Sequence, residues 1–352
     1  MGHRRSLAGQ WRQPDLAGHA HRSDNPYESD LMNLTDIGGP EIDAPFAQEL
    51  VRLGRERPDI VVLSADLSKY TDVLPFAETF PDRFIQVGMA EQNMMGIAGG
   101  LAKSGFTPIA VTYGVFATRR AGEQIQMALS TGPGNTAVVV AFLPGISTPF
   151  TATHQATDDL AIMRNVPGMT VIDPADATDM TLSIRAAVEV PGPVYLRGLR
   201  GMVRQIIDPA RYPFVIGKAY ELVGGSHVGL IGTGLGTQWA LEAREILARQ
   251  GIEAAVLHVP TIKPLDSEAI AHFASRFLAI ATVENHGVNG ALGSAVSEVL
   301  AERGLATVLH RLGVGDQWAD AGPLDYIRSR LNLDPEGLAL TVSNAIREMR
   351  TA

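Results

Sequence analysis

Short apolar runs alternate with amphipathic stretches over residues 37–201, and this alternation restricts the possible folds more than any other feature. The apolar runs span residues 60–63, 84–87, 108–112, 137–142, 170–172 and 194–196. Helical patterns lie between them at residues 44–55, 90–103, 116–130, 156–164 and 177–188. Nearly continuous apolar strands that are separated by helices indicate a parallel sheet covered on both faces.

A second unit of the same type follows a proline-containing stretch without periodicity, which indicates a linker. Its strand patterns lie at residues 228–231, 254–259, 278–284 and 306–312, and its helical patterns at residues 237–249, 289–303 and 340–349. The two units share no sequence repeat. We therefore predict an α/β protein with two parallel-sheet domains.

The domain boundaries follow from these patterns. Residues 1–36 are polar and aperiodic, so we predict a flexible leader there. The first domain is predicted over residues 37–203, the linker over residues 204–219 and the second domain over residues 220–352.

Composition excludes several classes of function. The chain of 352 residues has a formal charge of −9 and no dense basic block, so we expect no nucleic-acid partner. The absence of cysteine excludes disulfides and thiolate-bound metals. No apolar run is long enough to span a bilayer and no secretory signal is present, so we expect no membrane association and a cytoplasmic location.

The strongest candidate for chemistry is Glu91, which lies in the first turn of the helix predicted over residues 90–103. Met, Ile, Ala and Gly surround it, so the helix is expected to be buried on nearly all sides. A buried carboxylate needs a hydrogen-bond partner or a proton. The alternative is a Glu that completes the helix N-terminus, where negative charge is favourable.

Other polar residues also follow strands. His154 and Gln155 come after the strand at residues 137–142 and a loop rich in Pro, Gly and Thr. Because polar groups at the carboxyl ends of parallel strands gather at one edge of a sheet, we expect His154 and Glu91 on a common rim. Arg197 and Arg200 follow another strand, and they either bind an anionic substrate or pair with acidic helices.

Two motifs in the second unit have simpler interpretations. The glycines of residues 232–236 follow a strand and begin a helix, but the third glycine of a dinucleotide fingerprint would fall on Thr237. We therefore predict a tight turn there. Residues 284–287 (Glu-Asn-His-Gly) also connect a strand to a helix, and we interpret them as a turn with a helix cap.

Taken together, five segments resemble the transketolase family of thiamine-diphosphate enzymes. They occur in family order at residues 64–67, 91–94, 153–155, 171–176 and 284–296. The resemblance extends from about residue 37 to the C-terminus. It implies a pyrimidine-binding domain followed by the transketolase C-terminal domain.

The resemblance also implies a cofactor site. Glu91 is expected to hydrogen-bond the aminopyrimidine ring nitrogen of thiamine diphosphate and thereby help the cofactor to lose its thiazolium proton. Phe116 is expected to stack on the pyrimidine, and Asp66, Tyr113 and Arg119 to surround the cofactor. Family members often carry aromatic residues where this chain has Arg119 and a glycine at position 122. Another group would then complete the aromatic wall.

The donor pocket implied by the resemblance departs from that of transketolases. His154 is expected to bind or protonate at the donor carbonyl, with Gln155 beside it and Arg200 at an anion-binding position. In transketolases an Asp that binds a donor hydroxyl occupies the position of Phe150. A His that helps to bind the terminal phosphate of the sugar occupies the position of Phe142. The sequence therefore predicts a less polar or non-phosphorylated donor.

A second chain is also implied. The sequence lacks the Gly-Asp-Gly signature, followed by Asn about 25–30 residues later, with which the family holds Mg²⁺ and the diphosphate. We therefore predict no metal ligands in this chain. We predict a partner subunit that supplies them, with the active site between the subunits of a heterotetramer.

The predicted function is the transfer of a two-carbon ketol unit from a ketose or 2-oxo donor to an aldehyde by one subunit of a split enzyme. Two alternatives remain open. One is a 2-oxoacid-decarboxylating subunit similar to deoxyxylulose-phosphate synthase or to the β subunit of an oxoacid dehydrogenase. The other is a non-catalytic assembly subunit.

Overall fold

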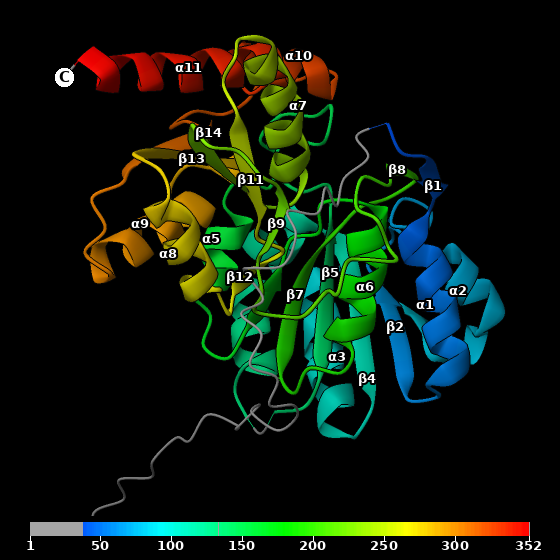
Figure 1. Cartoon of the computed structure of the whole chain (residues 1–352). Coiled ribbons are helices and arrows are strands. Elements are labelled where there is room, and N and C mark those ends of the chain that lie inside the picture. Colours follow the sequence, from blue (N-terminus) through cyan, green and yellow to red (C-terminus); the bar gives the residue numbers. More distant parts are fainter. Residues whose placement is uncertain (1–37, 133, 352) are drawn as a thin grey trace, which may run out of the picture. The chain divides into compact units, whose positions relative to one another are not determined.

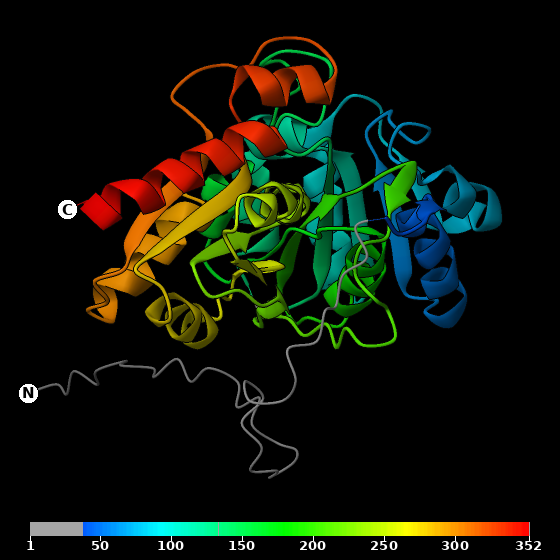
Figure 2. The same cartoon turned by 45° about the horizontal axis from the view of Figure 1, so that its top comes forward.

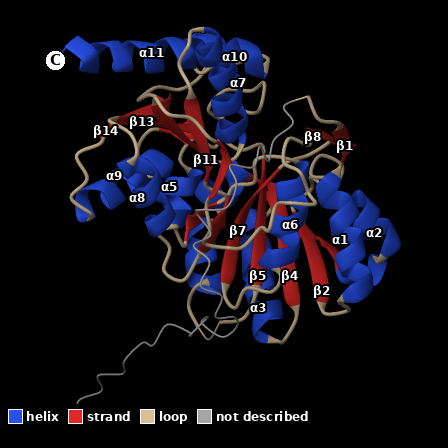
Figure 3. Cartoon of the chain, viewed as in Figure 1, coloured by secondary structure: helices blue, strands red, loops and turns tan. Residues whose placement is uncertain are grey.

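The computed structural model describes residues 38–132 and 134–351. The predicted flexible leader, residues 1–36, lies outside the described residues. The described part contains a seven-stranded sheet and a five-stranded sheet, each with helices packed against it (Figures 1 and 3). The predicted α/β fold with two parallel-rich sheets is confirmed.

The larger sheet has the strand order β12-β6-β7-β5-β4-β2-β3. Its strands are β2 (Ile60–Ser64), β3 (Phe84–Gln86), β4 (Thr107–Tyr113), β5 (Ala137–Phe142), β6 (Thr170–Ile172), β7 (Pro193–Gly198) and β12 (Thr261–Lys263). All neighbouring strands are parallel except β12, which runs antiparallel to β6. Every residue of β2, β4, β5, β6 and β7 is buried, as their nearly continuous apolar character predicts.

Helices cover both faces of this sheet. They are α1 (Pro45–Glu56), α2 (Leu74–Thr79), the 3₁₀ turn η1 (Pro81–Arg83), α3 (Glu91–Lys103), α5 (Asp159–Arg164) and α6 (Ala177–Ala187). Alternate residues of β4 enter different cores: Ile109 packs with α1 and α6, while Ala110 packs with α3. The side chains of one strand therefore anchor helices on opposite sides, as strand geometry requires.

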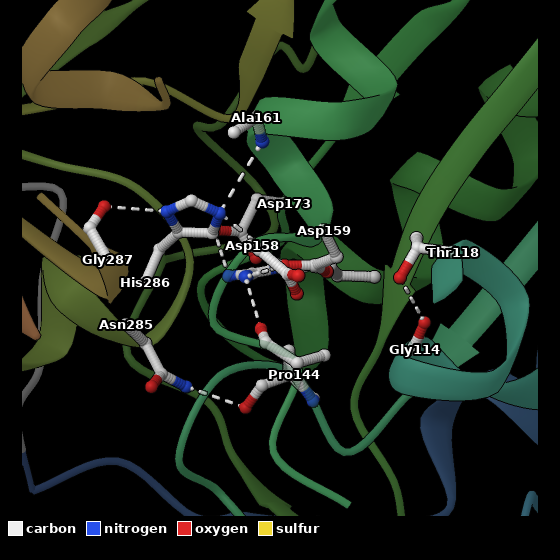
Figure 4. Close-up of polar contacts among 12 residues, drawn as sticks. Gly114, Thr118, Pro144, Asp158, Asp159, Ala161, Asp173, Asn285, His286 and Gly287 are labelled. Carbon is white, nitrogen blue, oxygen red and sulfur yellow. Dashed lines mark hydrogen bonds and ion pairs between the residues drawn. The ribbon is translucent and has the colours of Figure 1, made fainter. Parts of the chain in front are cut away.

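The predicted single helix over residues 116–130 is wrong. Two π-helical turns, η2 (Phe116–Arg120) and η3 (Ile125–Leu129), flank the short helix α4 (Gly122–Gln124). The buried Thr118 hydroxyl donates a hydrogen bond to the Gly114 carbonyl at 2.8 Å (Figure 4), a contact that bends helices. Gly122 weakens the helix further. π-Turns of this kind are frequent at functional sites.

The smaller sheet has the order β14-β13-β10-β11-β9, with β9 antiparallel to β11 and the rest parallel. Its strands are β9 (Tyr220–Val223), β10 (Val228–Gly232), β11 (Ala254–His258), β13 (Ala279–Gly287) and β14 (Val308–Val314). The helices of this region are α7 (Leu235–Arg249), α8 (Ser267–Ser275), α9 (Leu292–Glu302), α10 (Leu324–Arg330) and α11 (Pro335–Thr351). In Figure 2 helix α11, red, lies on the opposite side of the described part from helices α1 and α2, blue.

Two short strands, β8 and β12, form pairings that the sequence did not indicate. Strand β8 (Met202–Arg204) pairs with β1 (Glu41–Asp43) at the start of the segment expected to be a linker. Strand β12 follows β11 in the chain but joins the larger sheet through β6. The larger sheet is therefore completed by a segment from the second half of the sequence.

The glycine-rich turn at residues 232–236 is a tight turn, as predicted. Gly234 has a φ of 50°, and a Cβ there would lie 2.3 Å from the Asp173 carboxylate. A Cβ on Gly236 would lie 2.2 Å from the Val283 carbonyl oxygen. These glycines are needed for close packing of the turn.

Within residues 38–132 and 134–351, no helix combines the length and the apolar character that crossing a membrane requires.

Candidate active site

Glu91 is the first residue of α3, and its side chain is buried, as predicted (1% exposed). Its counter-charge is Arg120, at the end of η2. The Arg120 Nη1 atom lies 2.8 Å from Glu91 Oε1 and 2.9 Å from Oε2. The guanidinium carbon of Arg120 also lies 4.4 Å from the centre of the Phe116 ring. Glu91 is therefore an ion-paired carboxylate next to an aromatic face.

Helix α3 itself is not buried on all sides, which corrects the expectation from its composition. Gln92, Asn93, Gly96 and Gly100 are exposed, and Met89 just before the helix is 80% exposed. Small and apolar residues thus occupy a surface of this chain. Only the face that carries Glu91, Met94 and Met95 enters the core.

An aromatic group lies next to the Glu91–Arg120 pair. The His154 ring centre is 5.4 Å from that of Phe116, 6.2 Å from that of Tyr113 and 4.7 Å from that of Phe150. Tyr113 and Phe116 are stacked at 5.9 Å. The His154 Nδ1 atom lies 2.9 Å from the Thr153 hydroxyl, which leaves Nε2 as the ring nitrogen for a ligand. The structure therefore brings His154 and the arginine that pairs with Glu91 to the same ring, that of Phe116.

Arg119, assigned to the cofactor by the resemblance, has other partners here. Its Nε and Nη2 atoms donate to the Asp158 carboxylate at 2.9 and 2.8 Å, and Nη1 donates to the Ala152 carbonyl at 3.0 Å. Its guanidinium carbon lies 5.2 Å from the centre of the Trp318 ring. Arg119 therefore ties the His154 region to a loop from the second half of the chain.

Arg200 and Asp66 lie at the ends of strands on the same rim. Arg200 is exposed, and its Nη1 atom donates to the Tyr70 carbonyl at 2.6 Å. Burial raises the pKa of the Tyr113 hydroxyl, and the nearby charge of Arg200 opposes that shift. Asp66 is exposed at the end of β2, with a φ of 58°, and its backbone N–H donates to the Gln86 side chain at 2.7 Å.

Gln155 and Phe142 are both fully buried, with different consequences. The Gln155 Nε2 atom donates to the Asp320 carbonyl at 3.2 Å, and its Oε1 atom has no hydrogen-bond partner among the described residues. Phe142 packs edge-to-face against Phe46 at 5.3 Å and closely against Gly198. Phe142 therefore belongs to the core and not to the donor pocket that the resemblance assigned to it.

A buried polar junction contains Asp159, Asp173 and His286 (Figure 4). The Asp159 carboxylate accepts hydrogen bonds from Arg197 at 2.5 Å and from the Tyr195 hydroxyl at 2.7 Å. Arg197 also reaches Asp173 at 3.2 Å. Of the two roles considered for Arg197, pairing with acidic residues is therefore the one that the structure shows. The His286 Nε2 atom accepts a hydrogen bond from the Ala161 N–H at 3.4 Å.

Residues 284–287 are the last residues of β13, so the turn predicted there is wrong, whereas the predicted helix cap is present. The Glu284 carboxylate accepts hydrogen bonds from the N–H groups of Leu292 and Gly293, at 2.9 and 3.0 Å, at the start of α9. Burial raises the pKa of Glu284 to about 7, although these two hydrogen bonds oppose the shift.

The residues around Glu91 suit an aminopyrimidine ring. Such a ring needs a carboxyl group that can share a proton with its ring nitrogen, which Glu91 would supply, and an aromatic face, which Phe116 would supply. It also needs room: Gly122 is buried, yet a Cβ added there would meet no atom within 4 Å. Arg120 now covers part of this place. Among the described residues, no group of three or more His, Asp or Glu side chains is arranged to hold a metal ion.

The sequence patterns did not indicate three residues that contact the candidate site residues: Arg120, Asp158 and Trp318. Arg120 had a signal, because it follows Phe116 by four residues on the same predicted helix. Trp318 had none, because its contact with Arg119 joins segments about two hundred residues apart in the chain.

Two protein families match this chain. Residues 40–205 match the transketolase pyrimidine binding domain, and residues 217–338 match the transketolase C-terminal domain. The chain belongs to the transketolase family.

Individual relatives are similar over nearly their whole length. A transketolase family protein of Sinorhizobium fredii is 41% identical over 96% of this chain and 98% of its own. A 6-deoxy-6-sulfo-D-fructose transketolase subunit of a Clostridium species is 38% identical over 82% of this chain and 89% of its own. A solved structure entitled "Split gene transketolase, inactive beta4 tetramer" has a TM-score of 0.76 and 37% identity, and the match covers 86% of this chain and 97% of that one.

Transketolase-family proteins of another type match over only part of their length. A 1-deoxy-D-xylulose-5-phosphate synthase of Geobacter sulfurreducens is 36% identical over 84% of this chain, which corresponds to 46% of its own length. The resemblance inferred from five sequence segments, to a split transketolase, is therefore confirmed by these matches.

Proposed function

We propose that this chain is the pyrimidine-binding subunit of a split, thiamine-diphosphate-dependent transketolase-like enzyme of the cytoplasm. A partner subunit holds Mg²⁺ and the diphosphate, in a heterotetramer with its active site between subunits. The enzyme transfers a two-carbon ketol unit from a ketose or 2-oxo donor to an aldehyde. The observation that carries the proposal is a buried carboxylate, Glu91, beside the Phe116 face and His154.

On the cofactor side, Glu91 and Phe116 would hold the aminopyrimidine ring. Thiamine diphosphate, when bound, supplies the carbanion chemistry of the reaction. Glu91 holds a proton at the ring nitrogen, and the Phe116 face fixes the plane of the ring. Arg120 must leave the Glu91 carboxylate before the ring can occupy that place, because one guanidinium N–H group contacts both oxygens. Asp66 and Tyr113 border the cofactor side of the site, and the contacts of Arg119 are with the His154 region.

On the donor side, His154 is the group that meets the donor carbonyl. The Thr153 hydroxyl fixes the Nδ1 atom, so Nε2 faces the donor and donates or accepts its proton. Gln155, the next residue, is buried, and its Oε1 atom has no hydrogen-bond partner in the part of the chain that the structure describes. Arg200 is exposed and suited to an anionic end of the donor.

The donor class follows from Phe150, whose exposed ring lies 4.7 Å from that of His154. Because Phe150 stands where transketolases have an Asp, a polyol donor would lack a hydrogen-bonding partner at this position. We therefore propose a donor other than a standard sugar phosphate. The name of the Clostridium relative, which acts on a sulfo-sugar, is in line with a non-phosphorylated anionic donor.

The test is native mass spectrometry of the chain purified from its own cells. We expect a second chain that carries a Gly-Asp-Gly…Asn segment, with thiamine diphosphate bound to the complex. Recovery of the chain alone and free of cofactor would instead support a non-catalytic assembly subunit. Release of CO₂ from a 2-oxoacid by the complex, without transfer from ketoses, would support the decarboxylating alternative.

A further inference from the structure

The loop of residues 143–158, here called the His154 loop, belongs to the first domain but is held by the second. At its base, the Asn285 side chain accepts a hydrogen bond from the Ile146 N–H at 2.9 Å and donates one to the Pro144 carbonyl at 2.9 Å (Figure 4). Gly145 has a φ of 55°, and a Cβ there would lie 2.1 Å from the Asn285 carbonyl oxygen. The base of the loop is therefore fitted closely to Asn285.

The second domain also reaches the tip and the end of the loop. The Gly322 N–H donates to the Pro149 carbonyl at 3.0 Å, next to Phe150. The Gly287 N–H donates to the Thr157 carbonyl at 2.8 Å. Since the Gln155 side chain also donates to the Asp320 carbonyl, the loop is bonded to the second domain on both sides of His154.

Arg119 and Trp318 make a further contact between the His154 loop and the second domain. Arg119 holds the loop through the Asp158 carboxylate and the Ala152 carbonyl, on either side of His154. Its guanidinium then lies against the Trp318 ring at 5.2 Å. Trp318 is 65% exposed, so its ring takes little part in a core. An indole against a guanidinium is a favourable cation–π contact.

We propose that the second domain sets the position of His154 through this contact, with Trp318 and Arg119 as positioning residues. The role of His154 itself rests on the proposed function. Arg119 stands where the family often has an aromatic that faces the cofactor. In this chain that position serves the donor side, because Arg119 anchors the His154 loop to Trp318.

The first test measures amide hydrogen exchange in the isolated full chain, and it requires no ligand. The N–H groups of His154 and Gln155 donate to the Thr151 carbonyl, so they report on the order of the loop. Trp318→Ala should speed their exchange about three- to five-fold, the effect expected from one exposed cation–π contact. Leu278→Ala is the control, because Leu278 is 80% exposed and precedes β13 at the opposite end from the site.

The second test uses the assembled complex with hydroxypyruvate as the donor probe. Trp318→Ala should raise the KM for hydroxypyruvate about three- to ten-fold and leave the Kd for thiamine diphosphate and the melting temperature unchanged. Trp318→Phe, which keeps an aromatic face, should restore most of the loss. Leu278→Ala should behave as the wild type.

Unchanged loop exchange and unchanged KM in Trp318→Ala would overturn the inference. A lower melting temperature with an unchanged KM would also overturn it, because it would show a purely structural role. If the wild-type complex bound no thiamine diphosphate, the proposed function would fail. The exchange experiment would still decide whether Trp318 orders the loop.

Discussion

At the scale of single residues, the site is built around a carboxylate whose present partner is a guanidinium. Glu91 is nearly inaccessible, while the Arg120 side chain is half-exposed (48%). The Arg120 side chain, which is the exposed partner, can change its position without displacing core residues. The chain therefore holds its buried charge with a group that can be displaced without opening the core.

Removal of Arg120 tests this arrangement. Arg120→Met should lower the free energy of unfolding of the isolated chain by about 1–3 kcal/mol, because Glu91 is left buried without a counter-charge. The double variant with Glu91→Gln should recover most of the loss. Urea unfolding at pH 7 measures both values.

The matched control for this variant is Arg303→Met. Arg303 pairs with Glu268, and both side chains are exposed (44% and 72%), so its loss should cost less than about 1 kcal/mol. If Arg120→Met and Arg303→Met cost the same, Glu91 does not depend on Arg120.

At the scale of elements, the sequence predicted most strands of both sheets, because buried parallel strands are continuous apolar runs. Strand β5 over Ala137–Phe142 is an example with the predicted limits. The same run misled the site prediction. The sequence position of Phe142 matched a pocket residue, but its ring points into the core against Phe46. A motif gives the position of a residue and not the direction of its side chain.

The segment after Phe116 shows why local periodicity was insufficient. Its apolar spacing fits one helix, yet the structure has two π-turns around α4. Propensity cannot indicate a π-turn that depends on a side-chain bond to a carbonyl, as Thr118 makes to Gly114. Short strands such as β12 were missed for a similar reason, because their partner strand is distant in the sequence.

Two glycines near the site should respond oppositely to alanine. Gly122→Ala should stabilise the isolated chain by about 0.5–1 kcal/mol, because the new methyl group meets no atom within 4 Å and the unfolded chain loses freedom. Gly99→Ala should destabilise it, since the Cβ would lie 2.7 Å from the Ala128 carbonyl oxygen. Thermal unfolding of both variants measures the difference. Stabilisation by Gly99→Ala would show that α3 and η3 are not packed as described.

At the scale of the whole molecule, a carboxyl group buried in the second half of the chain makes stability depend on pH. Burial raises the pKa of Glu284 from 4.5 to about 7. Between these values folded Glu284 keeps a proton that the unfolded chain releases. Its contribution to stability is therefore complete below pH 4.5 and decreases as the pH rises to about 7, by up to about 1.4 kcal/mol per pH unit.

Glu284→Gln should remove this contribution. Relative to the wild type, the variant should become progressively more stable as the pH rises from 5 to about 7, and the difference should then stay constant (about pH 7–8). Urea unfolding of the isolated chain at several pH values measures it. Glu302→Gln, at the exposed end of α9, is the control for the removal of a carboxylate from the surface. A difference between Glu284→Gln and the wild type that does not vary with pH would contradict the assigned protonation.

The candidate site could be predicted from the sequence only in part. Glu91 and His154 were predicted as site residues because each follows a strand, and parallel strands bring such positions to one edge. The contacts of Arg119 with Asp158 and Trp318 join three separate segments, so no local pattern indicates them. Contacts between distant segments are set by the assembled fold.

The central claim is that Glu91 activates thiamine diphosphate in a complex of this chain with a partner. The most direct measurement is the rate at which the thiazolium C2 proton of bound thiamine diphosphate exchanges with solvent deuterium, followed by NMR on the purified complex. We expect rapid exchange in the wild type and a rate at least about 100-fold lower in Glu91→Gln. Equal exchange rates in the two complexes, with cofactor bound in both, would contradict it.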